Sequence, residues 1–396
     1  MRVPFLDLAA QYRELQVDLD AAVARVVRDQ RFILGPEVEG LEFEVADYLG
    51  SQHAVGCASG TDALLLSVRA LGLPPGAEVV VPAFTFFATA GAVWNAGLRP
   101  AFADVDPRTL NLTAETIEAA LTPDTRAVIV VHLYGRMADM DPILALCRER
   151  RLVLIEDAAQ SFGATGDVAG RRARAGTVGD LGCLSFFPTK ILGGFGDGGM
   201  VVTDDPVLAD RVAKLRVHGG RQMYHHEIVG TNSRLDALQA AVLRVKLPHV
   251  DRWIAARRAL AGSYHDGLRG TDVALPPGAP SRDPRTGATR GGAEGAGAGH
   301  GDAFNIYTVR VPGRDRVRAR LASAGIGVAV YYPVPLHLQE CFRPLGHGPG
   351  AFPVSEEAAR AVLSLPMYPE MPAEHVEIVV AALRGAVRGA DGRDTD

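Results

Sequence analysis

The chain has 396 residues, of which 47% are hydrophobic and 22% are charged, and a formal net charge of -5. This length favours two packed units. The acidic balance, with no basic stripe, argues against a nucleic-acid-binding protein, and the longest apolar runs are too short to span a bilayer. The opening stretch MRVPFLDLAAQYRELQ has early acidic residues and no apolar core. We therefore expect no signal peptide and a cytoplasmic protein.

The first fifty residues show the apolar periodicity of two helices. Residues 14–29 place Leu15, Leu19, Val23 and Val26 on one face of a helix. Residues 37–50 predict a second helix that ends at a glycine.

Short apolar strands then alternate with helices. We predict strands at 53–59, 77–84, 99–105, 126–135 and 152–159, with helices at 61–73, 85–97, 113–121 and 140–151 between them. This alternation predicts an α/β fold with a mostly parallel sheet covered by helices on both faces. Ligands of such sheets bind at the carboxyl ends of the strands, so polar residues there are the first candidates for chemistry. These residues are Ser59, Gly60, Thr61, Thr85, Phe86, His132, Tyr134, Asp157 and Gln160.

A long helical stretch at 234–268 contains Pro248, which breaks or kinks a helix. We place the boundary between two domains there. The predicted organisation is an N-terminal helical segment, 1–30, that packs on the small domain, a large domain, 31–250, and a small C-terminal domain, 251–396.

The predicted small domain is a compact α/β unit. Residues 278–301 are rich in Gly, Pro and Arg, and we expect them to form a flexible surface loop. We then predict a strand at 304–311, a helix at 315–326 and a strand at 327–335. The chain ends in a helix and a polar tail.

Lysine is rare in this chain, which has it only at Lys190, Lys214 and Lys246. Lys190 ends the apolar stretch SFFPTK and precedes GGFGDGG, where glycine permits turns that other residues tolerate poorly. A lysine in a partly dry pocket has a lowered pKa and can form a Schiff base with a carbonyl cofactor. The alternative is an ordinary solvated surface lysine.

Two further stretches fit such a cofactor. Asp157 ends the apolar strand LVLIED, where it could cap a helix or keep the ring nitrogen of pyridoxal phosphate protonated. Gly60 and Thr61 lie between a strand and a helix, where backbone N–H groups bind phosphate, although a simple helix cap fits equally well. Ser185 could add a hydroxyl to the same phosphate.

Other cofactors fit the sequence poorly. GGFGDGG matches the dinucleotide fingerprint GxGxxG, but it precedes a strand and does not link a strand to a helix, which argues against a nicotinamide site. His225 and His226 lack a second pair of ligands. The four cysteines, Cys57, Cys147, Cys183 and Cys341, make no CxxC pair. We therefore expect reduced thiols and no metal ion.

Seven segments in order carry a family resemblance: SGTDAL, PAFTFFATA, HLYG, EDAAQSFGA, SFFPTK with GDGG, TNSRLDALQAA and YYPVPLHLQ. Together they resemble the DegT/StrS-type nucleotide-sugar aminotransferases, which are fold-type I pyridoxal-phosphate enzymes. The resemblance covers nearly the whole chain apart from 278–301 and the tail. It implies a large domain with a mostly parallel sheet between helices, a smaller C-terminal α/β domain, and a homodimer with active sites at the subunit interface.

The resemblance assigns roles residue by residue. Lys190 matches the lysine that forms the Schiff base and later moves a proton between cofactor and substrate. Asp157 matches the partner of the pyridinium nitrogen, Gln160 a residue near the ring hydroxyl, and Phe86 the aromatic that stacks on the ring. The residues that match the phosphate site are Gly60, Thr61, Asp62 and Ser185.

Three residues have weaker assignments. Asn232 matches an asparagine that reaches the phosphate from the partner subunit, although by itself it would be read as a helix cap. Tyr332 and His337 are candidate substrate contacts, and a packing role is an equal alternative for each.

Lysine at position 190 favours amino transfer, because a related dehydratase branch has histidine there. The segments PFLDLAAQYREL and FILGPEVEGLE resemble the branch that aminates C3 of a keto sugar. Ile306 and Arg136 stand where glutamine is more usual, which leaves the exact sugar open.

The resemblance implies that L-glutamate converts pyridoxal 5'-phosphate to pyridoxamine 5'-phosphate, which aminates a dTDP-3-keto-6-deoxyhexose in amino-sugar biosynthesis. Three alternatives remain: a keto-cyclitol substrate, a UDP-linked or 4-keto sugar, and a regulatory relative without turnover.

Overall fold

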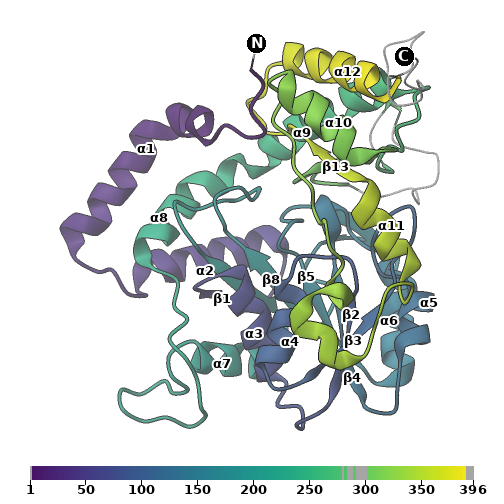
Figure 1. Ribbon diagram of the computed structural model, residues 1–396. Helices are drawn as coiled ribbons and strands as arrows, with labels where there is room; N and C mark the ends of the chain where they lie inside the picture. The colour runs from purple at the N-terminus through teal and green to yellow at the C-terminus, as the bar shows by residue number, and fades with distance from the viewer. Residues whose placement is uncertain (1, 279–280, 283–288, 291–300, 389–396) are drawn as a thin grey trace.

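The computed structural model describes residues 2–278, 281–282, 289–290 and 301–388. Its centre is a seven-stranded sheet with helices on both faces (Figure 1). The strands are β1 (His53–Cys57), β2 (Glu78–Pro82), β3 (Arg99–Ala103), β4 (Thr125–Val131), β5 (Val153–Asp157), β8 (Leu181–Ser185) and β9 (Gly199–Thr203). Their order is β1-β9-β8-β5-β4-β2-β3. Only β9 runs antiparallel to its neighbours, so the predicted mostly parallel α/β fold is confirmed.

The strands are apolar because both of their faces are buried. Along β4, Val128 and Val130 pack into one core cluster, and Ala127 and Ile129 pack into the cluster on the other side. Successive side chains of a strand point to opposite faces, which explains the continuous apolar run.

Helices cover each face of the sheet (Figure 1). The core cluster of Val128 contains residues of α1 (Leu8–Asp29), α2 (Pro36–Leu49), α5 (Ala114–Ala120), α6 (Met140–Arg150) and α8 (Ala237–Lys246). The cluster of Ile129 contains residues of α3 (Gly60–Ala70), α4 (Ala88–Asn95) and α7 (Pro206–Leu215). Outside the sheet, β6 (Thr165–Val168) and β7 (Arg171–Arg174) form a hairpin.

The C-terminal part of the chain has its own core. It contains residues of α9 (Val250–Leu268), β12 (Tyr307–Arg310), α10 (Arg314–Ser323), β13 (Val362–Leu365) and α12 (Ala373–Arg388). The predicted break at Pro248 is confirmed, since a 3-10 turn at Leu247–His249 separates α8 from α9. α11 (Pro353–Ala361) precedes β13, and two 3-10 helices, Leu336–Leu338 and Glu340–Leu345, lie before it. The domain division at residue 250 stays a prediction.

The N-terminal segment divides between the two parts. Val3 forms a parallel bridge with Ile326 of the C-terminal part. α1 instead lies beside α8 (Figure 1), and its residues Ala22 and Val26 pack against Ala237 and Ala241. Only the short stretch before α1 therefore packs where we expected the whole segment 1–30 to pack.

One predicted strand is wrong. Residues 327–335 form no strand, and Ala329 makes only an isolated bridge with Ser364. Pro333 and Pro335 lack backbone N–H groups and cannot continue a ladder. The antiparallel partner of β12 is instead β13, a strand that the sequence analysis did not predict.

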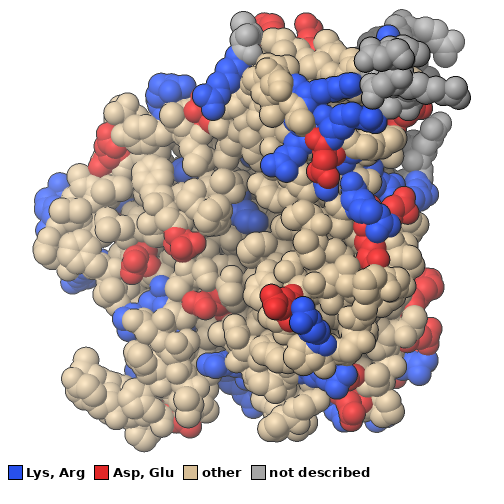
Figure 2. Space-filling view, in the orientation of Figure 1, with Lys and Arg blue, Asp and Glu red and all other residues tan. Residues whose placement is uncertain are grey.

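Most of the predicted loop at 278–301 lies outside the described residues. Two short strands of this segment are described, β10 (Ser281–Arg282) and β11 (Thr289–Arg290), and they pair with each other. In the described ranges, no helix is long and apolar enough to cross a membrane. Figure 2 shows basic and acidic side chains mixed over the visible face and separated by uncharged residues.

Candidate active site

A cavity of about 860 Å³ lies where the carboxyl ends of the sheet strands face the C-terminal part of the chain. Its wall brings together residues that follow β1, β2, β5 and β8, which are far apart in the sequence. The candidate residues in this wall are Ser59, Gly60, Thr61, Thr85, Phe86, Asp157, Gln160, Ser185, Lys190 and Tyr332. Asp62, Asn232 and His337 lie outside it.

Lys190 lies on the loop between β8 and β9 and is half-buried. Burial lowers the pKa of its amine to about 8, although the charge of Asp157 opposes this shift. A minor neutral fraction therefore exists near neutral pH and grows as the pH rises toward 8, and a neutral amine can act as a nucleophile or a base.

Asp157 is 5% exposed at the end of β5. Its Oδ2 accepts a hydrogen bond from the Thr89 hydroxyl at 2.8 Å, and its Oδ1 accepts one from the Ala159 N–H at 3.2 Å. Burial raises the pKa of Asp157, and the hydrogen bond from Thr89 opposes this. A poorly solvated carboxylate that faces a cavity is suited to pair with a cationic group of a ligand.

The side-chain amide of Gln160 is fixed at both ends. Its Oε1 accepts a hydrogen bond from the Tyr134 N–H at 2.8 Å, and its Nε2 donates one to the Tyr332 hydroxyl at 2.9 Å. The Tyr134 hydroxyl in turn donates to the carbonyl of Tyr331. Because both ends are engaged, the amide presents a defined edge to the cavity, and Tyr332 belongs to the same network.

The N-terminal end of α3 forms another part of the wall. Ser59 caps this helix, and its hydroxyl accepts the Asp62 N–H at 3.1 Å. A Cβ atom on Gly60 would lie 2.6 Å from Cβ of Ser185, so only glycine permits this approach. The first N–H groups of the helix and the hydroxyls of Thr61 and Ser185 therefore face one corner, which suits a phosphate.

Asp62 differs from its neighbours in this corner. Its carboxylate accepts a hydrogen bond from the Ser233 hydroxyl at 2.7 Å. The carboxylate thus supports the helix start from outside the cavity, and only the helix end itself faces the proposed phosphate site.

The aromatic candidate Phe86 lies on the cavity wall and is 53% exposed. Its ring centroid is 6.0 Å from that of Tyr332. An exposed ring face beside Asp157 and Lys190 can stack on a flat ligand.

Asn232 is exposed and forms an isolated bridge with Val217. His337 is 1% exposed, its ring packs against Phe352, and its Nε2 lies 3.2 Å from Glu356. This placement favours the packing role of His337 over contact with a substrate.

Sequence reasoning missed several residues around the cavity. The segment Arg2–Leu6 forms part of the wall, together with Asp197, Asn305 and Met367. These residues come from distant parts of the chain, and no local pattern marks them. The Thr89 hydroxyl donates a hydrogen bond to Asp157. Thr89 lies only a few residues after the end of a predicted strand, and this position could have marked it as a site residue.

A buried pair supports the end of β5. His132 Nε2 lies 2.7 Å from Glu156 Oε2, and the Ala138 N–H donates to His132 Nδ1 at 3.2 Å. The proton is therefore on Nε2 and is donated to Glu156. Burial alone would raise the pKa of Glu156, but the hydrogen bonds from His132 and from backbone N–H groups lower it. His132 thus stabilises the strand end next to Asp157 without lining the cavity.

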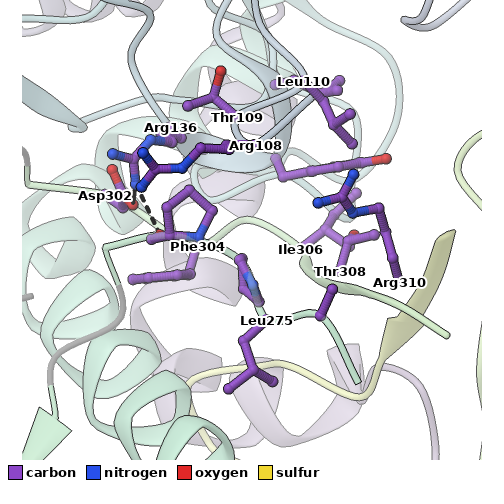
Figure 3. A pocket seen from close by; sticks show the side chains of 16 residues that line it. Arg108, Thr109, Leu110, Arg136, Leu275, Asp302, Phe304, Ile306, Thr308 and Arg310 are labelled. Carbon is purple, nitrogen blue, oxygen red and sulfur yellow. Dashed lines mark hydrogen bonds and ion pairs between the residues drawn. The ribbon is translucent and has the colours of Figure 1, made fainter. Parts of the chain in front are cut away.

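A small pocket of about 40 Å³ lies beside the cavity and shares Ile306 with it (Figure 3). Figure 3 shows Arg136 directed toward Asp302, with Nη1 2.8 Å from Oδ2. Arg136 also donates to the Pro277 carbonyl at 2.8 Å. Burial raises the pKa of Asp302 to about 6, and Arg136 opposes the shift. Arg136, which replaces the more usual glutamine, therefore joins the loop after β4 to the C-terminal part.

Within the part of the chain that the structure describes, no group of three or more His, Cys, Asp or Glu side chains could hold a metal ion. Cys57, Cys147 and Cys183 are buried thiols, and Cys341 is exposed. Burial raises the pKa values of the three buried thiols, so they are poor nucleophiles.

The chain is similar to known proteins over nearly its whole length. The model of the DegT/DnrJ/EryC1/StrS aminotransferase family matches residues 14–384. A dTDP-3-amino-3,4,6-trideoxy-alpha-D-glucose transaminase from Streptomyces venezuelae is 45% identical and covers 97% of this chain and 96% of its own. The X-ray structure of Streptomyces venezuelae DesV in complex with a ketimine intermediate is 43% identical, with a TM-score of 0.89, and the match covers 99% and 100% of the two chains.

Two further relatives have different names. A UDP-N-acetyl-3-dehydro-alpha-D-glucosamine 3-aminotransferase from Acidithiobacillus ferrooxidans is 43% identical over 98% of both chains. A pleiotropic regulatory protein from Geobacillus stearothermophilus is 44% identical over 96% of this chain and 97% of its own.

Proposed function

Because the chain belongs to the DegT/DnrJ/EryC1/StrS aminotransferase family, we propose that it moves an amino group from L-glutamate to C3 of a nucleotide-linked 3-keto sugar, using pyridoxal 5'-phosphate. The observation that carries this proposal is the single cavity that holds Lys190, Asp157, Gln160 and the N-terminal end of α3 together. Relatives named for 3-amino sugars support the position of amination.

The residues of the cavity fit pyridoxal phosphate. The corner at Gly60, Thr61 and Ser185 would hold the phosphate, and Phe86 would cover the ring. The buried carboxylate of Asp157 would pair with the ring nitrogen. When bound, this cofactor supplies an electron sink for the carbon that carries the amino group.

The protein groups have separate tasks in the reaction. Asp157 keeps a proton on the ring nitrogen, because a buried carboxylate is most stable beside a cation. Lys190 would hold the cofactor through Nζ, and its free amine would be the group that accepts and donates the proton of the substrate carbon. Its lowered pKa suits both tasks, since the amine is neutral often enough to accept a proton.

The glutamate half-reaction tests the activity. L-glutamate added to the cofactor-loaded protein should convert its visible absorbance to that of pyridoxamine 5'-phosphate, and a keto-sugar nucleotide should reverse the change. Lys190→Ala should show neither change. A wild-type spectrum that does not respond to glutamate would contradict the proposal and favour the regulatory role that one relative's name suggests.

The nucleotide is tested separately. We propose a dTDP-linked 3-keto-6-deoxyhexose, which follows the Streptomyces venezuelae relative. The second candidate is a UDP-linked 3-keto sugar, which the relative from Acidithiobacillus ferrooxidans favours. The glutamate-treated protein is mixed with each nucleotide sugar in turn. The sugar that restores the pyridoxal 5'-phosphate absorbance is the substrate, and the other should leave the spectrum unchanged.

We further propose a homodimer in which Asn232 contributes to the partner's phosphate site. Asn232 is exposed outside its own cavity. The stretch before it projects away from the body (Figure 1) and exposes Met223, Tyr224 and Val229. Exposed apolar side chains on a projecting loop are suited to contact with a second copy.

A mixed dimer tests this assignment. If Asn232 acts on the partner's site, mixing Lys190→Ala with Asn232→Ala subunits generates one complete site per heterodimer, and activity returns. Two inactive sites in the heterodimer would show that Asn232 does not act on the partner's site. Light scattering of the same samples measures the subunit number.

A further inference from the structure

Lys246 is 3% exposed at the end of α8. Its Nζ donates a hydrogen bond to the carbonyl of Gly193 at 2.7 Å, and it lies 5.0 Å from the ring centroid of Phe195. Both contacts belong to the glycine-rich stretch that follows Lys190. Lys246 lies outside the cavity wall, so its ammonium acts on the loop and not on a ligand.

A second side chain of α8 contacts the same stretch. Gln239 lies seven residues before Lys246, which is about two helical turns, so both project from one face. Its Oε1 accepts the Phe195 N–H at 2.8 Å. A Cβ atom on Gly194 would lie 2.7 Å from this oxygen, so glycine is needed for the loop to approach the helix.

The loop itself is folded into a closed turn. The Lys190 N–H donates to the Phe187 carbonyl, and the Gly194 N–H donates to the Phe186 carbonyl, both at 2.8 Å. A Cβ atom on Gly193 would lie 2.4 Å from the Pro188 carbonyl oxygen. These internal bonds fix the shape of the turn, but its position against the body depends on contacts from outside.

We propose that Gln239 and Lys246 are positioning residues that hold the Lys190 turn against α8, so that the Lys190 amine reaches the cofactor site. The Gly193 carbonyl is buried, and a buried acceptor that loses its donor is unfavourable. Without Lys246, the turn would leave this position to reach water, and Lys190 would spend less time in reach of the cofactor. This inference rests on the proposed role of Lys190.

Lys246→Met and Gln239→Leu test the inference, with Lys214→Met as the matched control. Lys214 pairs with Asp210 and Glu227 near the surface, away from the turn. Each test variant should bind pyridoxal phosphate roughly tenfold more weakly and lose kcat, with KM for glutamate unchanged. Lys214→Met should match the wild type in all three quantities.

Melting of the cofactor-free proteins separates positioning from general stability. We expect a larger change in cofactor affinity than the loss of apo-protein stability explains. Wild-type affinity and kcat in a folded Lys246→Met protein would overturn the inference. If that variant does not fold, the same result in Gln239→Leu overturns it. Such an outcome would leave the proposed function intact, because Lys190→Ala tests that function directly.

Discussion

Replacing Thr89 with valine tests how the site keeps Asp157 ionised. Valine has nearly the shape of threonine but cannot donate the 2.8 Å hydrogen bond to Oδ2. A hydrogen bond to a charged group contributes about 1.5 to 3 kcal/mol, so its loss corresponds to a roughly ten- to hundredfold change in an equilibrium. The carboxylate would be less stable, and its pKa, already raised by burial, would rise further.

The assay follows the pH dependence of kcat/KM for glutamate. The reaction needs ionised Asp157, so activity is lost as the pH falls through its pKa. In Thr89→Val this acidic limb should move to higher pH, and the dissociation constant of pyridoxal phosphate should rise most at low pH. Thr203→Val is the matched control, since that buried hydroxyl donates to the Asp180 carbonyl at 2.6 Å and lies outside the cavity wall. An unchanged acidic limb in Thr89→Val would refute this account of Asp157.

Three further substitutions give distinct outcomes. Gly60→Ala places a methyl group 2.6 Å from Cβ of Ser185, so the phosphate corner must open. We expect at least roughly tenfold weaker cofactor binding in a titration. Wild-type affinity would contradict the placement of the phosphate at Gly60. Tyr332→Phe removes the hydroxyl that accepts the hydrogen bond from the Gln160 amide. Losing this hydrogen bond costs about 1 kcal/mol, so kcat should fall by roughly fivefold. An unchanged kcat would exclude a role of the Tyr332 hydroxyl in positioning Gln160. Arg136→Gln removes the ion pair of the buried Asp302 carboxylate and leaves only the charge of Arg258 near it, which should destabilise the protein by about 3 kcal/mol at pH 8. Because Asp302 already has a raised pKa of about 6, protonation should reduce that loss at pH 5; equal losses in thermal melts at both pH values would contradict this.

Most of the site could be predicted because parallel strands end at one edge of the sheet. Asp157 and Gly60 end or follow strands whose apolar runs were predicted, and the sheet order brings them together. The strand β8, which ends at Ser185, was not predicted. The rare lysine at 190 and the glycine run after it marked the loop. Local pattern and topology were sufficient for this half of the cavity.

The rest depends on contacts between distant segments. The wall formed by Arg2–Leu6, Asn305 and Met367 arises only when the C-terminal part packs over the sheet. The predicted strand at 327–335 has the right apolar residues, but its prolines prevent a ladder and β13 takes its place. His337 was a candidate substrate contact with packing as an equal alternative, and its burial beside Phe352 and Glu356 is decided by tertiary packing.

Trapping the cofactor on the protein tests the central claim most directly. Borohydride reduction of the pyridoxal-phosphate-loaded protein, followed by peptide mass spectrometry, should place the label on Lys190 and not on Lys214 or Lys246, the two other lysines of the chain. Treatment with L-glutamate before reduction should remove the label, because the amino group then resides on the cofactor. A label on another lysine, or a Lys190 label that glutamate does not remove, would contradict the account.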